Sequence, residues 1–569
     1  MVLPTLTVFY AGPDTFAPRA AWALDTMAAL LGRRVALEHD PARARRCALA
    51  YAPAPVAGVP TIPCSDEAMR LLAAGAPLPP GSFRRFDGPD GPLAGAFAAD
   101  DVGAPGGASG PPDAAAPKSA GAPPDAAPRG GGAASTQAQD GAFAVPFDLV
   151  ASAFVLLACW DEHTCAARDR FGRLPYASSV FAANPALDIG TPAVDAYVCA
   201  LRAVLDARLV ELDEAPLPAP GWMWDGGSGG GDGPDRGDGP RGDATTRGAD
   251  APRFAVALTH DVDNVWRWTP RGFAATGYRA ARAALRTDWP ALGRELGDLC
   301  QWLTVHLPRG SDPHWTFASI MAGEDARGAG SSFFVIARHS HPRDGVQPRT
   351  YRRRIPAALA LLRAGGREVG LHGNDRDRLA ADLLDADRRD LEHRAGAPVD
   401  GVRYHYLRCL YHETLPLVET AGFAYDSSLA FAEHEGFRCG ASFPFHPYHL
   451  GEERPLRVLE VPLALMDTGL QGPQYRDLPA AAAERVALEI LERVRRAGGG
   501  VAVLWHNVRF DRRTGRDPQR PHPRSASGRG ELPWGRLQLP HRALRRSPPA
   551  EQAAALPQAR PRRAGAGVL

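Results

Sequence analysis

The sequence predicts an α/β protein in which a small N-terminal α/β unit precedes a barrel of parallel strands. Three observations lead to this class. Apolar runs of strand length alternate with helical stretches from residue 253 onward, which is typical of parallel βα units. Seven such strands are expected, and that number favours a barrel, although the periodicity also fits a doubly wound open sheet. A shorter alternation of the same kind begins the chain.

The N-terminal unit carries two recognisable helix starts. Pro18 suits a first helical position, where its missing N–H is not needed, and Ser65 is placed to cap a second helix. The elements expected in this unit are strands at residues 6–10, 34–37 and 47–51 and helices at residues 18–31 and 65–74.

Two stretches of low complexity interrupt the chain. Residues 102–141 consist largely of Ala, Gly, Pro, Asp and Ser and cannot bury enough apolar surface to offset their chain entropy, so we expect a disordered insert. Residues 216–252 form a Gly/Asp/Arg linker. Between these stretches, helices are expected at residues 146–160 and 192–209.

The predicted barrel follows the linker, with a long insertion at residues 266–330 after its first strand. Its strands are expected at residues 254–259, 332–336, 368–372, 401–407, 425–429, 458–465 and 501–506, and its helices at residues 350–364, 376–394, 413–421 and 479–497.

Six segments result from this division. The last one is rich in Arg, Pro, Ala and Gly, and it is either a disordered basic tail or, as we favour, the product of a shifted reading frame. The segments are residues 1–101 (first part of the N-terminal unit), 102–141 (insert), 142–215 (second, mostly helical part of that unit), 216–252 (linker), 253–510 (barrel) and 511–569 (tail).

Composition narrows the class of partner. With 65 Lys+Arg against 64 Asp+Glu, the chain gives no reason to expect nucleic acid or an anionic membrane as its main partner. The eight cysteines form no CxxC pair, which indicates reduced thiols in a cytoplasm. No signal peptide and no transmembrane segment is expected, because the best apolar run, residues 147–159, is too short to span a membrane.

The chemistry is expected to centre on the motif Thr259-His-Asp-Val-Asp263, which ends an apolar strand. Asp261 and Asp263 are two residues apart, so in extended backbone both carboxylates lean to one side of the strand. Two carboxylates this close need a cation between them or a proton on one of them.

Further imidazole and guanidinium groups follow at the ends of other predicted strands: His372, then Arg403, His405 and Arg408, and finally His506. Their recurrence at one face of a barrel is typical of a catalytic site. Oxygen and nitrogen ligands without thiolate suit Zn²⁺, with Co²⁺, Ni²⁺ or Mn²⁺ as alternatives. One carboxylate and two imidazoles can hold an ion that lowers the pKa of bound water, a second carboxylate can take that water's proton, and a separate imidazole can protonate the leaving group.

Four motifs in order resemble those of the polysaccharide deacetylase (NodB-homology) family. They are Leu258-Thr-His-Asp-Val-Asp263, Glu368-Val-Gly-Leu-His-Gly373, Gly401-Val-Arg-Tyr-His405 and Leu504-Trp-His-Asn507, and the resemblance covers residues 253–510. The preceding part resembles the N-terminal region of one bacterial branch of such proteins. The resemblance implies a distorted (β/α)₇ barrel that hydrolyses a carbon–nitrogen bond, typically removing an N-acetyl group from an amino sugar.

The resemblance also implies roles for matching residues. Asp261 resembles the catalytic base, Asp263 the metal-ligating carboxylate, His372 a metal-ligating histidine and His506 the general acid. Arg403 or Arg408 resembles the arginine that holds the base.

One position departs from the family pattern. A second histidine is usual four residues after the first, but this chain has Arg376 there, which cannot ligate a metal. His405 is our candidate for the missing ligand, with His260 and Asp426 as weaker ones. The expected activity is therefore a metal-dependent deacetylase acting on a carbohydrate or small amide. The alternatives are an impaired barrel that binds glycans or serves as a scaffold, and a hydrolase of a non-sugar cyclic amide.

Overall fold

The protein is described from a computed structural model, which places residues 3–89, 91–97, 145–220, 254–268, 270–304, 312–339, 341–344 and 348–510. The predicted insert at residues 102–141, most of the 216–252 linker and the 511–569 tail lie outside the described residues.

A parallel four-stranded sheet in the order β2-β1-β3-β4 begins the chain. Its strands are β1 (Thr5–Tyr10), β2 (Arg34–Glu38), β3 (Leu49–Ala52) and β4 (Thr61–Pro63), of which the first three confirm the prediction. The helices α1 (Ala17–Leu30) and α2 (Asp66–Ala73) are also confirmed. Ser65 caps α2 as predicted, because its hydroxyl accepts a hydrogen bond from the Ala68 N–H at 3.3 Å.

The rest of the N-terminal region adds a hairpin and several helices, which share one hydrophobic cluster with this sheet. A hairpin of β5 (Phe83–Gly88) and β6 (Gly91–Ala96), absent from the prediction, leads toward α3 (Leu149–Leu157), which Asp148 caps. The helix predicted at residues 146–160 is wrong at its end, because Cys159 adopts φ +45° and separates α3 from α4 (Trp160–Thr164). α5 (Val180–Ala183) and α6 (Ala193–Glu211) follow, and α6 confirms the predicted helix.

The larger sheet has eight strands in the order β14-β11-β10-β9-β8-β7-β16-β15, and each neighbouring pair is parallel. Each of the seven strands expected from the sequence has a counterpart in this sheet. They are β7 (Ala255–Val262), β8 (Ser331–Val335), β9 (Glu368–Gly373), β10 (Gly401–Tyr404), β11 (Tyr425–Asp426), the pair β14 (Leu459–Glu460) and β15 (Leu463–Met466), and β16 (Gly500–Leu504).

The two edges of this sheet come from one stretch of chain. The Val461 N–H donates to the backbone carbonyl of Asp426 on β11 at 2.9 Å, whereas the carbonyl of Pro462 accepts from the Ala502 N–H on β16 at 2.8 Å. Pro462 has no N–H to continue the first ladder, so the strand changes partner at this point. The sheet is therefore curled and compatible with a barrel.

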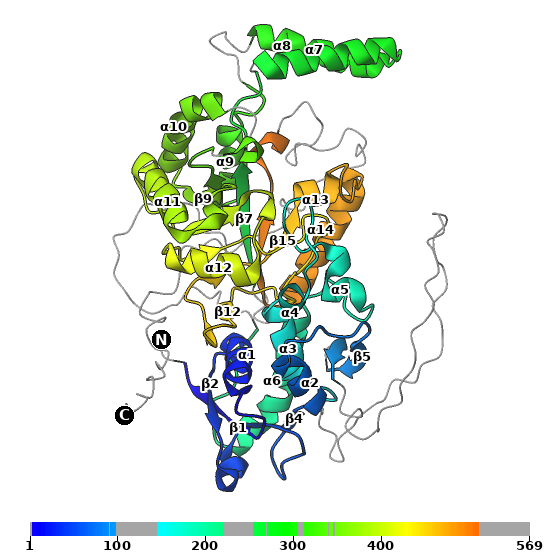
Figure 1. The fold of residues 1–569 in the computed structure, drawn as a ribbon, viewed down its shortest axis with the longest axis vertical. Coiled ribbons are helices and arrows are strands. Elements are labelled where there is room, and N and C mark those ends of the chain that lie inside the picture. Colours follow the sequence, from blue (N-terminus) through cyan, green and yellow to red (C-terminus); the bar gives the residue numbers. More distant parts are fainter. Residues whose placement is uncertain are drawn as a thin grey trace, which may run out of the picture.

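Helices flank the curled sheet (Figure 1). These are α9 (Phe317–Asp325), α10 (Pro348–Ala364), α11 (Ala381–Ala395), α12 (Tyr411–Thr420), α13 (Asp467–Gln471) and α14 (Ala480–Ala497). The helix predicted from Arg376 begins later, because Ala380 is extended and precedes α11. The insertion after β7 contributes α7 (Pro270–Leu285) and α8 (Trp289–Thr304), which extend away from the sheet (Figure 1).

The N-terminal region and the curled sheet share one hydrophobic cluster, which contains residues from Leu6 to Phe510. Polar contacts cross the same boundary: the Trp22 indole N–H donates to the His446 carbonyl at 2.9 Å, and buried Glu162 pairs with buried Arg438. In the described part of the chain, no helix combines the length and apolar character needed to cross a membrane.

Candidate metal centre

The candidate site lies where β7, β9 and β10 end. Asp261 is inside β7 and Asp263 directly follows it, while His372 is the fifth residue of β9. The predicted strand at residues 401–407 is too long: β10 ends at Tyr404, and His405 begins a 3₁₀ turn, η8 (His405–Leu407). His405 thus faces the site from a turn instead of from the strand.

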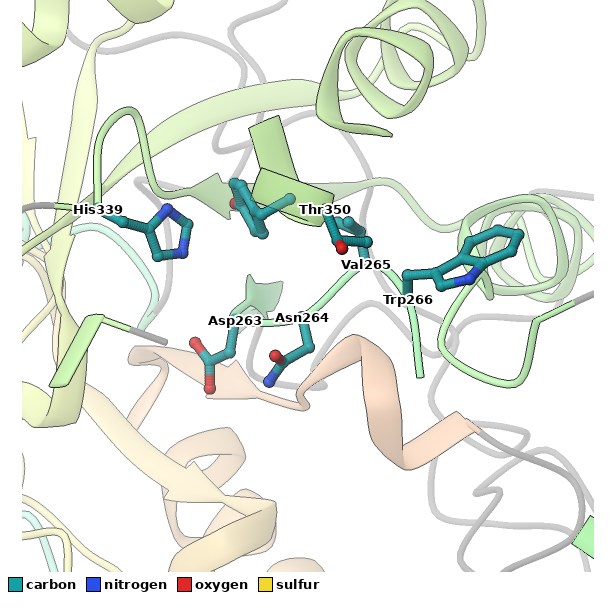
Figure 2. Close-up of a pocket in the computed structure, with 7 residues that line it drawn as sticks. Asp263, Asn264, Val265, Trp266, His339 and Thr350 are labelled. Atoms are coloured by element: carbon teal, nitrogen blue, oxygen red, sulfur yellow. The ribbon is translucent and has the colours of Figure 1, made fainter. Parts of the chain in front are cut away.

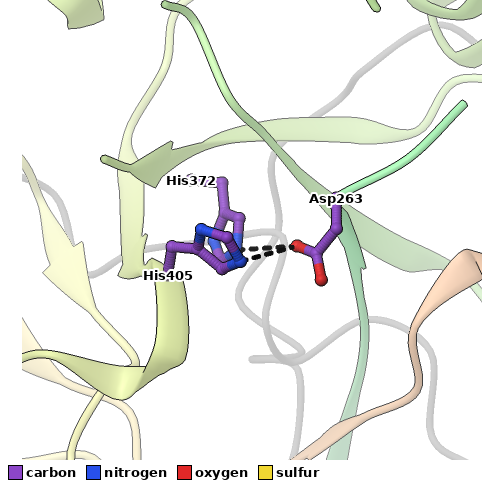
Figure 3. Close-up of side chains that lie close together, drawn as sticks. All are labelled: Asp263, His372 and His405. Atoms are coloured by element: carbon purple, nitrogen blue, oxygen red, sulfur yellow. Dashed lines mark ion pairs between the residues drawn. The ribbon is translucent and has the colours of Figure 1, made fainter. Parts of the chain in front are cut away.

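Asp263, His372 and His405 form a cluster that could hold a metal ion, with one ligand atom from each lying within 4.8 Å of the others (Figure 3). Oδ1 of Asp263 is 3.2 Å from Nε2 of His372 and 3.6 Å from Nε2 of His405. The separation of the ligand atoms and their chemistry, one carboxylate oxygen and two imidazole nitrogens, suit a divalent first-row ion.

Three buried atoms of the cluster residues have no hydrogen-bond partner, namely Oδ1 of Asp263, Nε2 of His372 and Nδ1 of His405. Leaving buried polar atoms unpaired costs free energy, so an orphaned oxygen and nitrogen that face each other fit a cation between them. The other ring nitrogen of His372, Nδ1, lies 2.9 Å from the Arg403 carbonyl, which can only accept. Nδ1 therefore carries the hydrogen, and the Nε2 lone pair of the neutral ring is directed at Asp263.

The protonation states also suit ligation. Burial opposes ionisation of Asp263, but the imidazoles of His405, His372 and His506 outweigh it and hold the pKa of this carboxyl far below its usual range. Burial lowers the pKa of His405 to about 4, so this ring is neutral at pH 7 and has a lone pair to offer. Burial also opposes charge on His372, but Asp261 and Asp263 outweigh it and raise the pKa of this ring.

Asp261 lies beside the cluster and is held by Arg403. Oδ2 of Asp261 is 3.8 Å from Nε2 of His372, and Oδ1 is 3.2 Å from Nη1 of Arg403. The fully buried Arg403 side chain also donates to Thr259 Oγ1 at 2.6 Å and to the Ser427 carbonyl and hydroxyl, both at 2.8 Å. This network fixes the orientation of the Asp261 carboxylate.

His506 approaches from the loop after β16, and Asp467 holds it. Nε2 of His506 lies 3.7 Å from Oδ2 of Asp263. Its Nδ1 lies 2.6 Å from Asp467 Oδ1, and its backbone N–H donates to Oδ2 of the same carboxylate at 2.9 Å. Burial disfavours the charged ring, but Asp467, Asp263 and Asp261 outweigh it and raise the pKa of His506 to about 10.

Asp467 is a further functional candidate, to which the sequence analysis assigned no role. It is the first residue of α13, directly after β15, and it is buried. Its position just after a strand could have identified it as a site residue, because the other members of the site also lie near the ends of strands.

The remaining sequence candidates lie outside the cluster. Arg408 donates to the Phe171 carbonyl at 2.8 Å and pairs with Asp375, so the arginine that contacts Asp261 is Arg403. The side chain of Arg376 approaches Asp387 on α11, with 3.8 Å between Nη2 and Oδ1.

His260 and Asp426, the weaker ligand candidates, are engaged elsewhere. The two ring nitrogens of His260 lie 2.7 Å from the Trp505 carbonyl and 2.8 Å from Glu324 Oε1. Asp426 accepts hydrogen bonds from the backbone and hydroxyl of Ser428.

A narrow pocket adjoins the cluster at Asp263 (Figure 2). Asp263 and His339 lie at one end of it and Trp266 at the other. The Arg354 guanidinium lies 3.8 Å from the centre of the Trp266 ring, so one face of the indole is already covered. The pocket is narrow and has room for little more than a water molecule beside Asp263.

Comparisons with known proteins find partial similarities. Residues 120–209 match a family of unknown function, DUF7033. Among solved structures, the chain is similar to a protein from Mycobacterium smegmatis provisionally named a polysaccharide deacetylase, at 19% identity and a TM-score of 0.30, over 48% of this chain and 83% of that one. It is also similar to a mutant of a CE4 family pseudoenzyme with restored enzymatic activity, at 11% identity and a TM-score of 0.23, over 45% of this chain and 57% of that one. No curated protein matches the sequence.

Proposed function

We propose that the chain is a metal-dependent hydrolase of carbon–nitrogen bonds that removes the acetyl group from an N-acetylated carbohydrate. The observation that supports this most is the cluster of Asp263, His372 and His405, with Asp261 and His506 each within 4 Å of one of its members. We further propose that residues 253–510 form the catalytic unit, a distorted (β/α)₇ barrel of the polysaccharide deacetylase type.

In this proposal Asp263, His372 and His405 hold a divalent ion, of which Zn²⁺ suits the ligand set best. The ion supplies a Lewis acid that activates water and polarises the amide carbonyl. Asp261 accepts the proton of the attacking water, and Arg403 keeps its carboxylate in place for that step.

His506 protonates the departing nitrogen. Asp467 bonds Nδ1, so the proton for transfer is on Nε2, the nitrogen that faces Asp263. Because its pKa is raised to about 10, His506 is charged at neutral pH and has this proton to give.

Acetate release by the purified full-length protein tests the proposal. N-acetylglucosamine oligomers and cyclic amides would be offered separately, with Zn²⁺ or Co²⁺ added after treatment with a chelator. Acetate should appear from the sugars, and Asp261→Asn should lower the rate by about 10²- to 10⁴-fold, the contribution typical of a general base. The matched control Asp390→Asn removes a partly exposed carboxyl on α11 and should leave the rate unchanged.

The other outcomes identify the alternatives. Cleavage of cyclic amides without acetate release from sugars would identify a non-sugar amidohydrolase. Binding of the oligomers without turnover of any substrate would identify an impaired barrel. Equal rates for the wild type and Asp261→Asn would refute the role of Asp261 as base.

A further inference from the structure

The turn that carries His405 has a costly backbone. Tyr406 and Leu407, which follow His405 in η8, have φ values of +61° and +54°. This left-handed region is unfavourable for residues with a Cβ, and it persists where surrounding contacts impose it. Contacts from other parts of the chain are therefore needed to hold this turn.

A loop of the N-terminal region contacts the turn directly. We call residues 169–173 the 169–173 loop. The Phe171 ring stacks on the Tyr406 ring with 4.8 Å between centroids and 17° between planes, and Tyr406 stacks in turn on the His405 imidazole at 4.0 Å and 18°. Phe171, Tyr406 and His405 therefore form one continuous stack that ends on a candidate metal ligand.

Hydrogen bonds fix the backbone of the same contact. Nη1 of Arg173 donates to the Tyr406 carbonyl at 2.7 Å. Asp169 accepts from Nε and Nη2 of Arg173 at 2.8 and 2.6 Å, so the guanidinium is held in place. From the turn's side, Nε of Arg408 donates to the Phe171 carbonyl at 2.8 Å.

From these contacts we infer that the 169–173 loop is a positioning element for the metal site: it holds the left-handed turn that presents His405. The inference rests on the metal ligation proposed above. Arg376 cannot ligate a metal, and in this inference His405 does so from the neighbouring turn. A ligand on a strained turn needs support from other contacts, which a ligand within a strand does not need. The inference also gives a role to the region that matches DUF7033, since the loop lies within residues 120–209.

Phe171→Ala in the full-length protein tests the inference. Phe171 is only half-buried, so its truncation should leave the fold intact, which circular dichroism and the urea midpoint check. Co²⁺ affinity would be measured by competition with a chelator, together with the visible spectrum of the Co²⁺ protein. We expect affinity to fall by about tenfold, as for other groups that orient a metal ligand, and Phe171→Tyr to restore it.

Two further variants distinguish a positioning role of the 169–173 loop from a general effect of packing. Tyr176→Ala is the matched control, because Tyr176 comes from the same region and stacks on His434 at 4.4 Å, away from the cluster; its Co²⁺ affinity should equal that of the wild type. In a His405→Ala background, Phe171→Ala should cause no additional loss of affinity, since the loop acts through His405.

The results discriminate among the claims. The inference is overturned if the wild type binds Co²⁺ and Phe171→Ala binds it equally tightly. It is also overturned if Tyr176→Ala weakens Co²⁺ binding as much as Phe171→Ala does. In both cases the proposed function stands. A wild type that binds no Co²⁺ overturns both. Tight binding that depends on Phe171 supports the inference even when no acetate is released.

Discussion

Arg403 offers a stringent test of the site's electrostatics, because its guanidinium is fully buried and faces an Asp261 carboxylate that is 2% exposed. Arg403→Met keeps much of the apolar volume of the side chain but leaves Asp261 as a buried charge without its partner. Breaking a buried ion pair in this way costs about 3–5 kcal/mol. The free energy of unfolding should fall by that amount.

A double-mutant cycle isolates the interaction between the two side chains. Asp261→Asn removes the charge that Arg403→Met leaves unpaired, so the double variant should be more stable than the sum of the single effects predicts, by about 2–3 kcal/mol. Urea unfolding in the presence of EDTA gives the four free energies without any contribution from bound metal.

The matched control is an exposed arginine–carboxylate pair. Arg495 and Glu492 on α14 lie 2.6 Å apart and are 40% and 38% exposed, so the same cycle with Arg495→Met and Glu492→Gln should give a coupling below about 1 kcal/mol. A coupling for Arg403 and Asp261 no larger than that of the control would refute the account of Asp261 as a carboxylate held by Arg403.

Two further predictions concern the N-terminal region. Glu162→Ala leaves Arg438 buried and unpaired, so urea unfolding should show a loss of about 3–5 kcal/mol, and a loss below about 1 kcal/mol would contradict this. Burial raises the pKa of Asp148 to about 7, so the folded protein keeps a proton that the unfolded chain releases at about pH 4. The free energy of unfolding therefore falls as pH rises from about 4 to about 7. Asp148→Asn should make this fall shallower by up to about 1.4 kcal/mol per pH unit. An unchanged dependence on pH would refute the raised pKa of Asp148.

The strands of the curled sheet could be predicted because their apolar runs are bounded by polar or glycine residues, and this local signal survives in the fold. The strand at residues 458–465 shows the limit of the signal. Its length is right, but Pro462 divides it between two neighbours, and only the tertiary structure shows which strands these are. The β5–β6 hairpin was missed because its Gly- and Arg-containing strands lack a clear alternation of apolar residues.

The composition of the candidate cluster could also be predicted, since each member lies near the end of a predicted strand. Which of the two arginines, Arg403 or Arg408, contacts Asp261 could not be predicted. The left-handed turn at Tyr406 and Leu407 ends the strand early, and Arg408 is directed toward Asp375 and Phe171. The contact between Phe171 and Tyr406 joins residues more than two hundred positions apart, for which the sequence carries no local signal.

The proposed function depends on the binding of a divalent ion by Asp263, His372 and His405. Metal analysis of the purified full-length protein after dialysis against Zn²⁺ tests it most directly. We expect about one equivalent of metal in the wild type and a large loss in His405→Ala. Arg376→Ala should also bind one equivalent, because the Arg376 side chain is directed at Asp387. Undiminished metal in His405→Ala, or none in the wild type, would contradict it.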